Sequence, residues 1–323
     1  MKIYIDNKEV EVCGQDTLLT ELRRLGIEVP TLCHSEQHRH VASCMVCMVK
    51  NVSNGQMIPS CSTKPTEGMR IETSSEEVLD MRRLSLELLL SDHRADCEAP
   101  CTQVCAKGLD VAQLLLYYDR GETAKAKAVL MAKKEAGETV PFCDGCEKTP
   151  CEKACRRRTI DSPVAIREII AEVEQSAIAP AIDFTSAAKL GKDQFCSRLG
   201  RYTETERERM KEIYDTHSRC LHCACEGREK CALRQLSNKA GIRSSRFGVS
   251  SALPVKEQIK VTDRLLFEPA KCIRCGLCVY NTEDGFTFQN RGFDMQVVIP
   301  ENSKKNIDEE IARICPTGAL FVR

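Results

Sequence analysis

The stretch from His93 to Cys155 constrains the fold most, because it carries two groups of cysteines separated by a helical run. The first group reads HRADCEAPCTQVC and the second CDGCEKTPCEKAC. The run VAQLLLYYDRGETAKAKAVLMAKKEAG between them has its apolar residues at helical spacing. A helical hairpin over this run would collect eight potential metal ligands, namely His93, Cys97, Cys101, Cys105, Cys143, Cys146, Cys151 and Cys155. Such a set suffices for two [4Fe–4S] clusters, since each takes four protein ligands.

The cysteines, 21 in a chain of 323 residues, indicate metal binding rather than disulfide bonds. Their number is odd, many stand in close groups, and the opening MKIYIDNKEVEV lacks the apolar core of a signal peptide. We therefore expect a protein of a reducing, cytoplasmic compartment. The formal net charge of +0 favours neither nucleic acid nor an anionic membrane as a partner. No apolar run is long enough to insert into a bilayer.

The amino-terminal residues predict a small α+β domain with a metal-binding loop. Residues 2–13 alternate around a turn at Asp6, which is typical of a β-hairpin, and residues 17–26 predict a short helix. The thiols that follow, spaced C-x10-C-x2-C-x13-C, are Cys33, Cys44, Cys47 and Cys61. Three thiols on one loop and a remote fourth are typical of plant-type [2Fe–2S] ferredoxins, with a loose zinc site as the alternative. Cys13 fits no ligand spacing, so we expect a packed side chain.

The long first gap in this spacing resembles the amino-terminal ferredoxin domain of the large peripheral iron–sulfur subunit of complex I and of [FeFe]-hydrogenases. A helix predicted over residues 74–92, with a capping box of Ser74 and Glu77, then leads to His93. These families carry H-x3-C-x2-C-x5-C at the equivalent place, where the histidine ligates a cluster. Because this chain has H-x3-C-x3-C-x3-C, the resemblance implies His93 and Cys97 as ligands. A capping or surface histidine is the alternative.

From Cys97 onward, a second resemblance covers C-x3-C-x3-C, then C-x4-C-x3-C-R and PVAIREIIAEV. These motifs resemble the amino-terminal two-cluster domain of the glutamate synthase small subunit and of dihydropyrimidine dehydrogenase. The resemblance implies interleaved ligands. One cluster would take Cys97, Cys101 and Cys155 together with His93. The other would take Cys105, Cys146 and Cys151 together with Cys143, although the usual proline after the third cysteine is Ala106 here.

The residues that follow Cys155 predict connecting turns, helices and a linker rather than a catalytic domain. Arg156 to Arg158 predict a solvated basic turn, with cations that raise the potential of a nearby cluster or bind an acidic partner as the alternative. Pro163 predicts the first residue of a helix that reaches about residue 177. Residues 178–200 predict a linker, in which Cys196 stands alone as a structural or free thiol. Residues 203–218 predict a charged helix.

Two more groups of thiols complete the pattern. The first, spaced C-x2-C-x-C-x5-C, consists of Cys220, Cys223, Cys225 and Cys231. It suits either an iron–sulfur cluster or a structural zinc ion, and His222 within it is interpreted as a bystander. The second group, in which the last cysteine precedes a proline, consists of Cys272, Cys275, Cys278 and Cys315. It resembles single-cluster bacterial ferredoxins, and we expect Gly276 and Gly318 to let backbone N–H groups approach the sulfurs.

These groups predict an α+β chain with four segments. They are a β-grasp [2Fe–2S] ferredoxin domain at 1–74, a helical two-[4Fe–4S] domain at 75–180, a linker with a four-cysteine metal-binding segment at 181–262, and a ferredoxin-like [4Fe–4S] domain at 263–323. The chain would hold one [2Fe–2S] cluster and three or four [4Fe–4S] clusters, with zinc at residues 220–231 as the alternative to the fourth.

The predicted function is a one-electron relay. Each cluster is closed by its ligands, and the chain has neither a G-x-G-x-x-G motif after a strand nor a P-loop, so we predict no substrate site of its own. The family resemblances imply, as partners, a flavoprotein subunit that oxidises NAD(P)H and a further redox subunit or a ferredoxin. The alternatives are a stand-alone iron–sulfur reductase or hydrogenase-type enzyme and a zinc-rich interaction scaffold.

Overall fold

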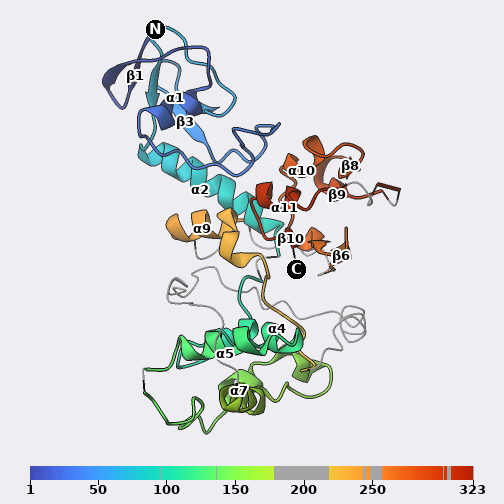
Figure 1. Ribbon diagram of the computed structural model, residues 1–323. Helices are drawn as coiled ribbons and strands as arrows, with labels where there is room; N and C mark the ends of the chain where they lie inside the picture. Colours follow the sequence, from blue (N-terminus) through green and yellow to red (C-terminus); the bar gives the residue numbers. More distant parts are fainter. Residues whose placement is uncertain are drawn as a thin grey trace. The chain divides into compact units, whose positions relative to one another are not determined.

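The computed structural model describes residues 1–94, 96–135, 137–177, 218–242, 245–247, 257–300, 302–303 and 307–322. The predicted linker at 178–200 with Cys196, and the predicted helix at 203–218 apart from its last residue, lie outside the described residues. Contacts divide the chain into two compact units, one made of Met1–Arg94 and Glu226–Arg323 and the other of Ala95–Cys225 (Figure 1). In sequence, the second unit is therefore an insertion in the first.

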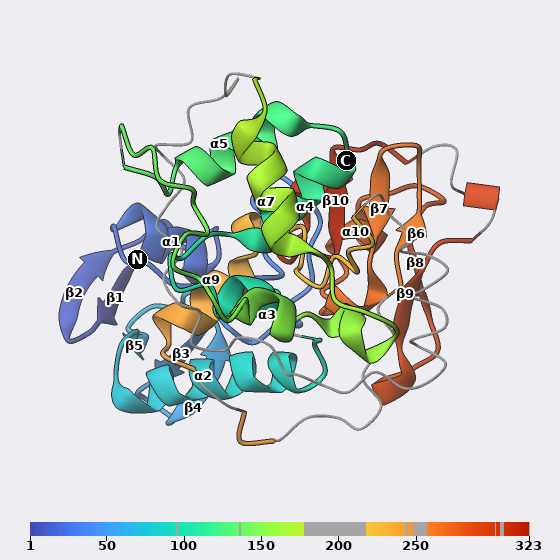
Figure 2. The same cartoon turned by 90° about the horizontal axis from the view of Figure 1, so that it is seen from below.

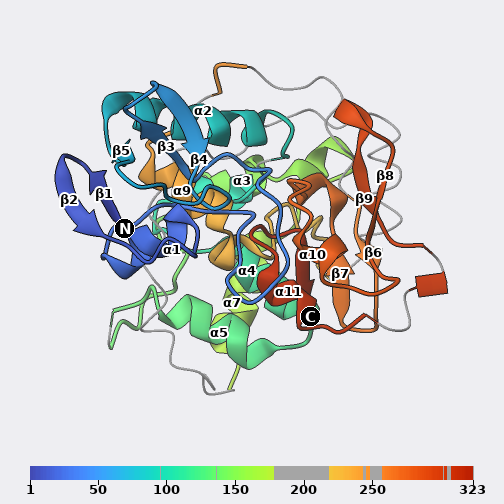
Figure 3. The same cartoon turned by 90° about the horizontal axis from the view of Figure 1, so that it is seen from above.

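The first unit begins with a mixed sheet of five strands. They are β1 (Lys2–Ile5), β2 (Lys8–Glu11), β3 (Met48–Asn51), β4 (Gln56–Pro59) and β5 (Arg70–Glu72), in the order β2-β1-β5-β3-β4. Strand β1 runs antiparallel to β2 and parallel to β5, and the β1–β2 hairpin forms one edge of the sheet (Figure 3). Alternation of side chains places Ile3 and Ile5 in the core. The predicted hairpin is confirmed, and its turn residues Asp6 and Asn7 adopt the positive φ angles of a tight turn.

Two helices accompany this sheet. Helix α1 (Leu18–Arg24) packs its buried leucines into the core of the sheet, and the side chain of Thr17 caps it. Helix α2 (Glu76–Ser91) follows β5. Its N-cap is Ser75, whose side chain makes no capping hydrogen bond, so the predicted capping box at Ser74 is wrong. A mixed sheet with helices confirms the predicted α+β class, whereas the division into four domains stays a prediction.

The carboxy-terminal part of the first unit consists of short elements. Its strands are β6 (Ile259–Lys260), β7 (Leu265–Phe267), β8 (Thr287–Gln289), β9 (Gln296–Val298) and β10 (Leu320–Val322). They form an antiparallel sheet of order β10-β7-β6 and a separate β8-β9 pair (Figure 2). The short helices are η2 (Arg228–Lys230), α9 (Ala232–Lys239), η3 (Pro269–Lys271), α10 (Leu277–Tyr280), η4 (Gly292–Asp294) and α11 (Ile311–Ile314). Phe267 packs edge to face on Phe286 in the core of this part.

The second unit is helical. Its elements are α3 (Pro100–Gln103), α4 (Val111–Asp119), α5 (Thr123–Met131), α6 (Pro150–Lys153), η1 (Arg156–Thr159) and α7 (Ile166–Gln175). The predicted helical hairpin is confirmed as α4 and α5, and α7 packs on both (Figure 2). Helix α7 begins three residues beyond Pro163, with Ala165 as its N-cap, so the predicted start is wrong. None of the helices in the described residues is both long and apolar enough to span a membrane.

Candidate metal centres

Four thiols converge beside the five-stranded sheet of the first unit. Cys33 and Cys44 lie on the loop between α1 and β3, Cys47 directly precedes β3, and Cys61 follows β4. Cys33 and Cys44 share a side-chain hydrogen bond, and so do Cys47 and Cys61. These hydrogen bonds lower the pKa of Cys33 to about 5 and that of Cys47 to about 6, and they raise the pKa of both partner thiols. The structure thus brings together the thiols that were predicted to bind a [2Fe–2S] cluster.

Helix α2 supports this cysteine loop. Ser85 Oγ donates to the carbonyl of Met45 at 2.9 Å, and Arg82 Nε donates to the carbonyl of Met48 at 2.9 Å. Burial lowers the pKa of Arg82, and the charge of the nearby Cys47 opposes that shift. A buried positive charge beside Cys47 favours the thiolate form that ligates iron. Sequence patterning did not point to Arg82, because nothing in its local sequence reveals that it faces the loop.

A second set of four thiols converges in the carboxy-terminal part of the first unit. A small cavity of about 20 Å³ is lined by all of them, namely Cys272, Cys275, Cys278 and Cys315. Burial, together with repulsion from Cys315, raises the pKa of Cys272 to about 12 and also raises the pKa values of Cys275 and Cys278. These shifts indicate that the thiols would repel one another if all of them lost their protons. The positive charge of bound iron ions would offset this repulsion.

The backbone around this set provides part of the expected support. Arg274 adopts a left-handed conformation, with φ at 54°, and its N–H donates to the Sγ of Cys272 at 3.3 Å. Gly276 is also left-handed, and a Cβ there would lie 2.8 Å from the ring of Tyr280. Only glycine therefore fits this turn without displacing the tyrosine. The predicted role of Gly318 toward the sulfurs stays a prediction.

The two sets of the first unit are neighbours. The N–H of Arg39 donates to Asn281 Oδ1 at 2.9 Å, and Asn281 Nδ2 donates to the carbonyl of Arg39 at 2.7 Å. Ser43 Oγ reaches the carbonyl of Cys275 at 3.5 Å. The charge of Cys33 contributes to the raised pKa of Cys275, after burial and the thiols of its own set. Loops that are far apart in sequence therefore place both sets side by side.

In the second unit, one group of thiols consists of residues that were predicted to share a cluster. Burial raises the pKa of Cys143, and repulsion from Cys146 and Cys105 adds to the shift. Burial likewise raises the pKa of Cys151 to about 11, with repulsion from Cys143 and Cys105. Cys105 follows α3, Cys143 and Cys146 lie on the loop after α5, and Cys151 lies in α6. These are the thiols that the sequence assigned to one of the two middle clusters.

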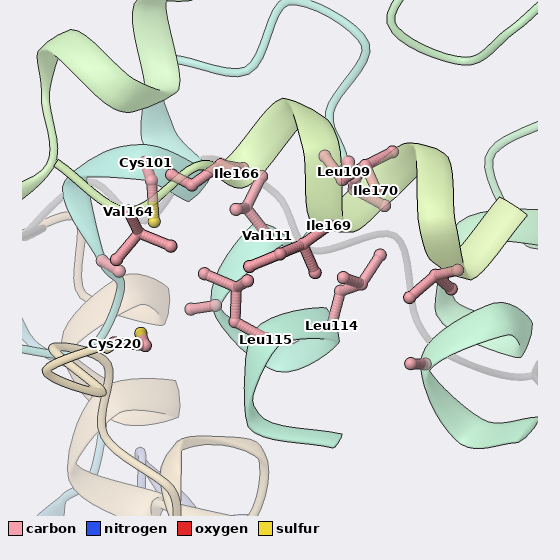
Figure 4. Packing of buried hydrophobic residues seen from close by; sticks show 14 of the residues in the cluster. Cys101, Leu109, Val111, Leu114, Leu115, Val164, Ile166, Ile169, Ile170 and Cys220 are labelled. Atoms are coloured by element: carbon pink, nitrogen blue, oxygen red, sulfur yellow. The ribbon is translucent and has the colours of Figure 1, made fainter. Parts of the chain in front are cut away.

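The other group of the second unit differs from the predicted partition. Burial raises the pKa of Cys101, with repulsion from Cys220 and Cys223 and then from Cys155 and Cys151. Figure 4 shows the sulfurs of Cys101 and Cys220 turned toward each other across the core. The spacing of the thiols predicts Cys220 and Cys223 in a separate site, because spacing alone cannot show that the chain returns to this core.

The remaining predicted ligands are distributed over both units. His93 follows α2 and is buried, and Cys231 caps α9, where the N–H of Arg234 donates to its Sγ at 3.5 Å. In the second unit, the N–H of Cys225 donates to the carbonyl of Cys97 at 3.3 Å. The role of these four residues as ligands stays a prediction.

Two smaller predictions are wrong. Arg156 and Arg157 are buried rather than solvated, because Arg156 pairs with Asp96 at 3.3 Å and Arg157 pairs with Asp161 at 2.8 Å. Cys13 is exposed rather than packed. Charge pairing inside the second unit thus accounts for basic residues that the sequence placed at the surface.

The spacing of the ligands also bears on zinc. Over the residues that the structure describes, no group of three or more His, Cys, Asp or Glu residues is placed to hold a single metal ion. Ligands of one zinc ion all lie within about 2.3 Å of the same atom, whereas ligands of a cluster bind different iron atoms and lie farther apart. Zinc at residues 220–231 stays a prediction from spacing.

Comparison with known proteins agrees with the amino-terminal geometry. Residues 1–76 match the family described as 2Fe-2S iron-sulfur cluster binding domain. The chain is 40% identical over 112 residues to the HndD subunit of the NADP-reducing hydrogenase of Solidesulfovibrio fructosivorans, which covers 33% of this chain and 18% of that protein. It is 24% identical over 239 residues to the G 2 subunit of the NADH-quinone oxidoreductase of Rhizobium meliloti (strain 1021), covering 69% of this chain and 26% of that protein. The chain thus spans about a quarter or less of the length of these relatives.

A solved structure shares the fold. A chain from the crystal structure of an NAD+-reducing [NiFe]-hydrogenase in the H2-reduced state aligns with a TM-score of 0.53 and 16% identity, over 100% of this chain and 87% of that chain. These similarities confirm the predicted resemblance to subunits of complex I and of hydrogenases. The amino-terminal part of the chain, where Cys33, Cys44, Cys47 and Cys61 meet, is thus similar to a 2Fe-2S iron-sulfur cluster binding domain.

Proposed function

We propose that the chain is an electron-transfer subunit of a cytoplasmic NAD(P)H- or ferredoxin-linked oxidoreductase and has no substrate site of its own. The observation that carries this proposal is that the loops of the two thiol sets of the first unit lie side by side, since Ser43 Oγ donates to the carbonyl of Cys275 at 3.5 Å. Transfer of an electron between two centres slows steeply with distance, so adjacent sets suit a relay. Relatives named as subunits of an NADP-reducing hydrogenase and of NADH-quinone oxidoreductase support the same function.

The thiol sets fit the proposed cofactors. The set of Cys33, Cys44, Cys47 and Cys61 would hold a [2Fe–2S] cluster, and the set of Cys272, Cys275, Cys278 and Cys315 would hold a [4Fe–4S] cluster. When bound, such clusters accept and return one electron at a time. The chain itself supplies thiolates, excludes water from them by burial, and directs N–H groups such as that of Arg274 toward sulfur.

The second unit would extend the relay. Its thiols form two groups on a helical core, and we propose that each group holds a [4Fe–4S] cluster. The partners would be a flavoprotein subunit that oxidises NAD(P)H and a further redox subunit or a ferredoxin. This assignment extends to the chain the kind of complex to which its relatives belong, an NADP-reducing hydrogenase and an NADH-quinone oxidoreductase.

Anaerobic purification of the full chain tests the proposal. We expect a brown protein with about 14–18 iron atoms and matching acid-labile sulfide, and electron paramagnetic resonance (EPR) signals of [2Fe–2S] and [4Fe–4S] clusters after reduction with dithionite. The chain alone should not oxidise NAD(P)H or dihydrogen. Turnover of either substrate by the single chain would favour a stand-alone enzyme instead, and a colourless protein that contains only zinc would favour an interaction scaffold.

A further inference from the structure

We propose that Cys220 and Cys223 join Cys101 and Cys155 in one four-thiolate site for a [4Fe–4S] cluster, and that Asp119 positions the loop that carries the first two. The inference rests on the proposed function, since it assumes that the second unit binds clusters. It differs from the partition predicted by spacing, in which Cys220 and Cys223 belonged to a site with Cys225 and Cys231.

Burial places these thiols in one core. Cys101, Cys220 and Cys223 are each 8% exposed and belong to the same hydrophobic cluster of the second unit, and Cys155 packs against it. In Figure 4, Val164 and Ile166 flank Cys101 while Leu115 lies on the side of Cys220. A site enclosed by such apolar side chains limits the access of water, and solvent access is one of the factors that set the potential of a bound cluster.

The charges of these thiols must also be balanced. Cys101, Cys220 and Cys223 are buried in the same core, and Figure 4 shows Cys101 and Cys220 on facing sides of it. Several buried thiolates in one core are costly unless a cation balances their charge, so a cationic iron core is the partner that this arrangement suits.

The turn between Cys220 and Cys223 has the geometry of a ligand loop. His222 is left-handed, with φ at 44°, and its N–H donates to the Sγ of Cys220 at 3.4 Å. The turn at Cys272 is built in the same way around Arg274. A hydrogen bond from a backbone N–H to sulfur stabilises the thiolate, which is the form that ligates iron.

Asp119, the last residue of α4, anchors this loop from the opposite side of the turn. Its carboxylate accepts from the N–H of Ser218 at 2.6 Å and from Ser218 Oγ at 2.7 Å, and it pairs with Nε2 of His222 at 3.0 Å. Burial would raise the pKa of Asp119, but the bonds from His222 and Ser218 hold it below its usual value. The loop is therefore tied to α4 at two points, one just before Cys220 and one between Cys220 and Cys223.

The assignment changes the interpretation of the ligand pattern. The helical stretch from Cys97 to Cys155 does not contain both complete sets of the second unit, because one set also needs thiols from the end of that unit. The other ligands predicted from the sequence, namely His93, Cys97, Cys225 and Cys231, stay outside the proposed site. Their spacings, H-x3-C and C-x5-C, match the outer parts of the H-x3-C-x2-C-x5-C pattern, so the sequence still predicts them as ligands.

Single substitutions in the full chain test the shared site. We expect Cys101→Ser and Cys220→Ser to abolish the same [4Fe–4S] EPR signal and to lower the iron content by about four atoms each. The exposed Cys13→Ser serves as the control and should change neither. If Cys220→Ser removes zinc, or a signal different from the one that Cys101→Ser removes, the assignment is wrong. Wild-type protein without iron would instead overturn the proposed function, so the two failures are distinct.

Asp119→Asn tests the positioning role. We expect it to lower the occupancy of that same cluster at least twofold and to shift its midpoint potential, while the [2Fe–2S] signal of the first unit stays unchanged. Glu168→Gln, at an exposed position of α7, is the control of equal charge change within the same unit. Equal loss of both second-unit clusters, or an unchanged cluster, would contradict the positioning role of Asp119.

Discussion

The turns at Cys220 and at Cys272 have the same local geometry but complete their ligand sets differently. In both, a left-handed residue directs its N–H to the sulfur of the first cysteine. The turn at Cys272 meets Cys278 on the adjoining helix α10 and Cys315 from the end of the same small domain. The turn at Cys220 shares its core with Cys101, and Cys155 packs against that core, although both come from much earlier in the chain.

This difference separates two kinds of information. The local sequence of a C-x2-C turn decides how its sulfurs are oriented, because that depends on a few φ angles and N–H groups. Helix packing decides which other thiols lie near the turn. Cys101 lies in the core that α4 and α7 form, and Cys155 packs against that core. Substitutions in one region should therefore leave the clusters of the other region intact.

Cys275→Ser should have the largest effect on the first unit. We expect a loss of about four iron atoms and of one [4Fe–4S] signal, with both second-unit signals retained. Because Cys275 adjoins the loop of Cys33, the remaining [2Fe–2S] signal should also saturate at lower microwave power once its paramagnetic neighbour is gone. Power-dependent EPR measures both effects. Loss of the second-unit signals would show that the two regions do not act separately.

Leu115→Ala should have the largest effect on the second unit without touching a ligand. Leu115 is fully buried in the core between α4 and α7 (Figure 4), so its truncation should cost about 2–5 kcal/mol of folding free energy. Thermal scans that follow each EPR signal should show both second-unit clusters released at a lower temperature. Leu88→Ala, at a position that is 49% exposed on α2, is the control and should change stability by less than about 0.5 kcal/mol.

Arg82→Gln should change the [2Fe–2S] site by a smaller amount. The buried guanidinium lies near Cys47, and a positive charge there favours the reduced, more negative cluster. Its removal should lower the midpoint potential by about 60 mV, which corresponds to a tenfold change in a one-electron equilibrium. A redox titration followed by EPR measures this shift. The exposed neighbour Arg83→Gln should leave the potential unchanged, and an equal shift in both variants would contradict a specific role for Arg82.

Much of this architecture could be predicted from the sequence. The hairpin at residues 2–13 follows from alternation, and α4 and α5 follow from helical spacing, since both patterns reflect local periodicity. The two sets of the first unit were also predictable, because each has three thiols on one short stretch. For each set, only the fourth ligand had to be assigned from a distant part of the sequence.

The other features of the structure depend on tertiary contacts, which cannot be recognised from the sequence next to either partner. Spacing grouped Cys220 with Cys231, although the structure turns Cys220 toward Cys101. The sequence around Asp119 indicates only the end of a helix. In the structure, its carboxylate accepts a hydrogen bond from the N–H of Ser218, which lies far away in sequence. The pairing of Arg156 with Asp96 was missed for the same reason, because partners distant in sequence cannot be deduced from either neighbourhood alone.

Glu174→Gln should have the smallest effect and a distinct pH dependence. Glu174 of α7 accepts from Lys134 Nζ at 2.6 Å and from the N–H of Phe142 at 3.0 Å, which ties α7 to the loop that leads to Cys143. Burial would raise the pKa of Glu174, but these two donors hold it below its usual value. The wild type should therefore be more stable than the variant by about 1 kcal/mol at neutral pH.

The sign of the pH dependence follows from the lowered pKa of Glu174. A carboxyl group whose pKa is depressed by folding stabilises the protein above its unfolded pKa, and this stabilisation is lost as the pH falls through the folded pKa. The difference between the unfolding midpoints of wild type and Glu174→Gln should thus be constant above about pH 5 and shrink below about pH 4. Circular dichroism at a series of pH values measures it, with Glu168→Gln on the exposed side of α7 as the control. A difference that grows on acidification would mean that Glu174 is held by burial rather than by Lys134, and that the loop carrying Cys143 depends on other contacts.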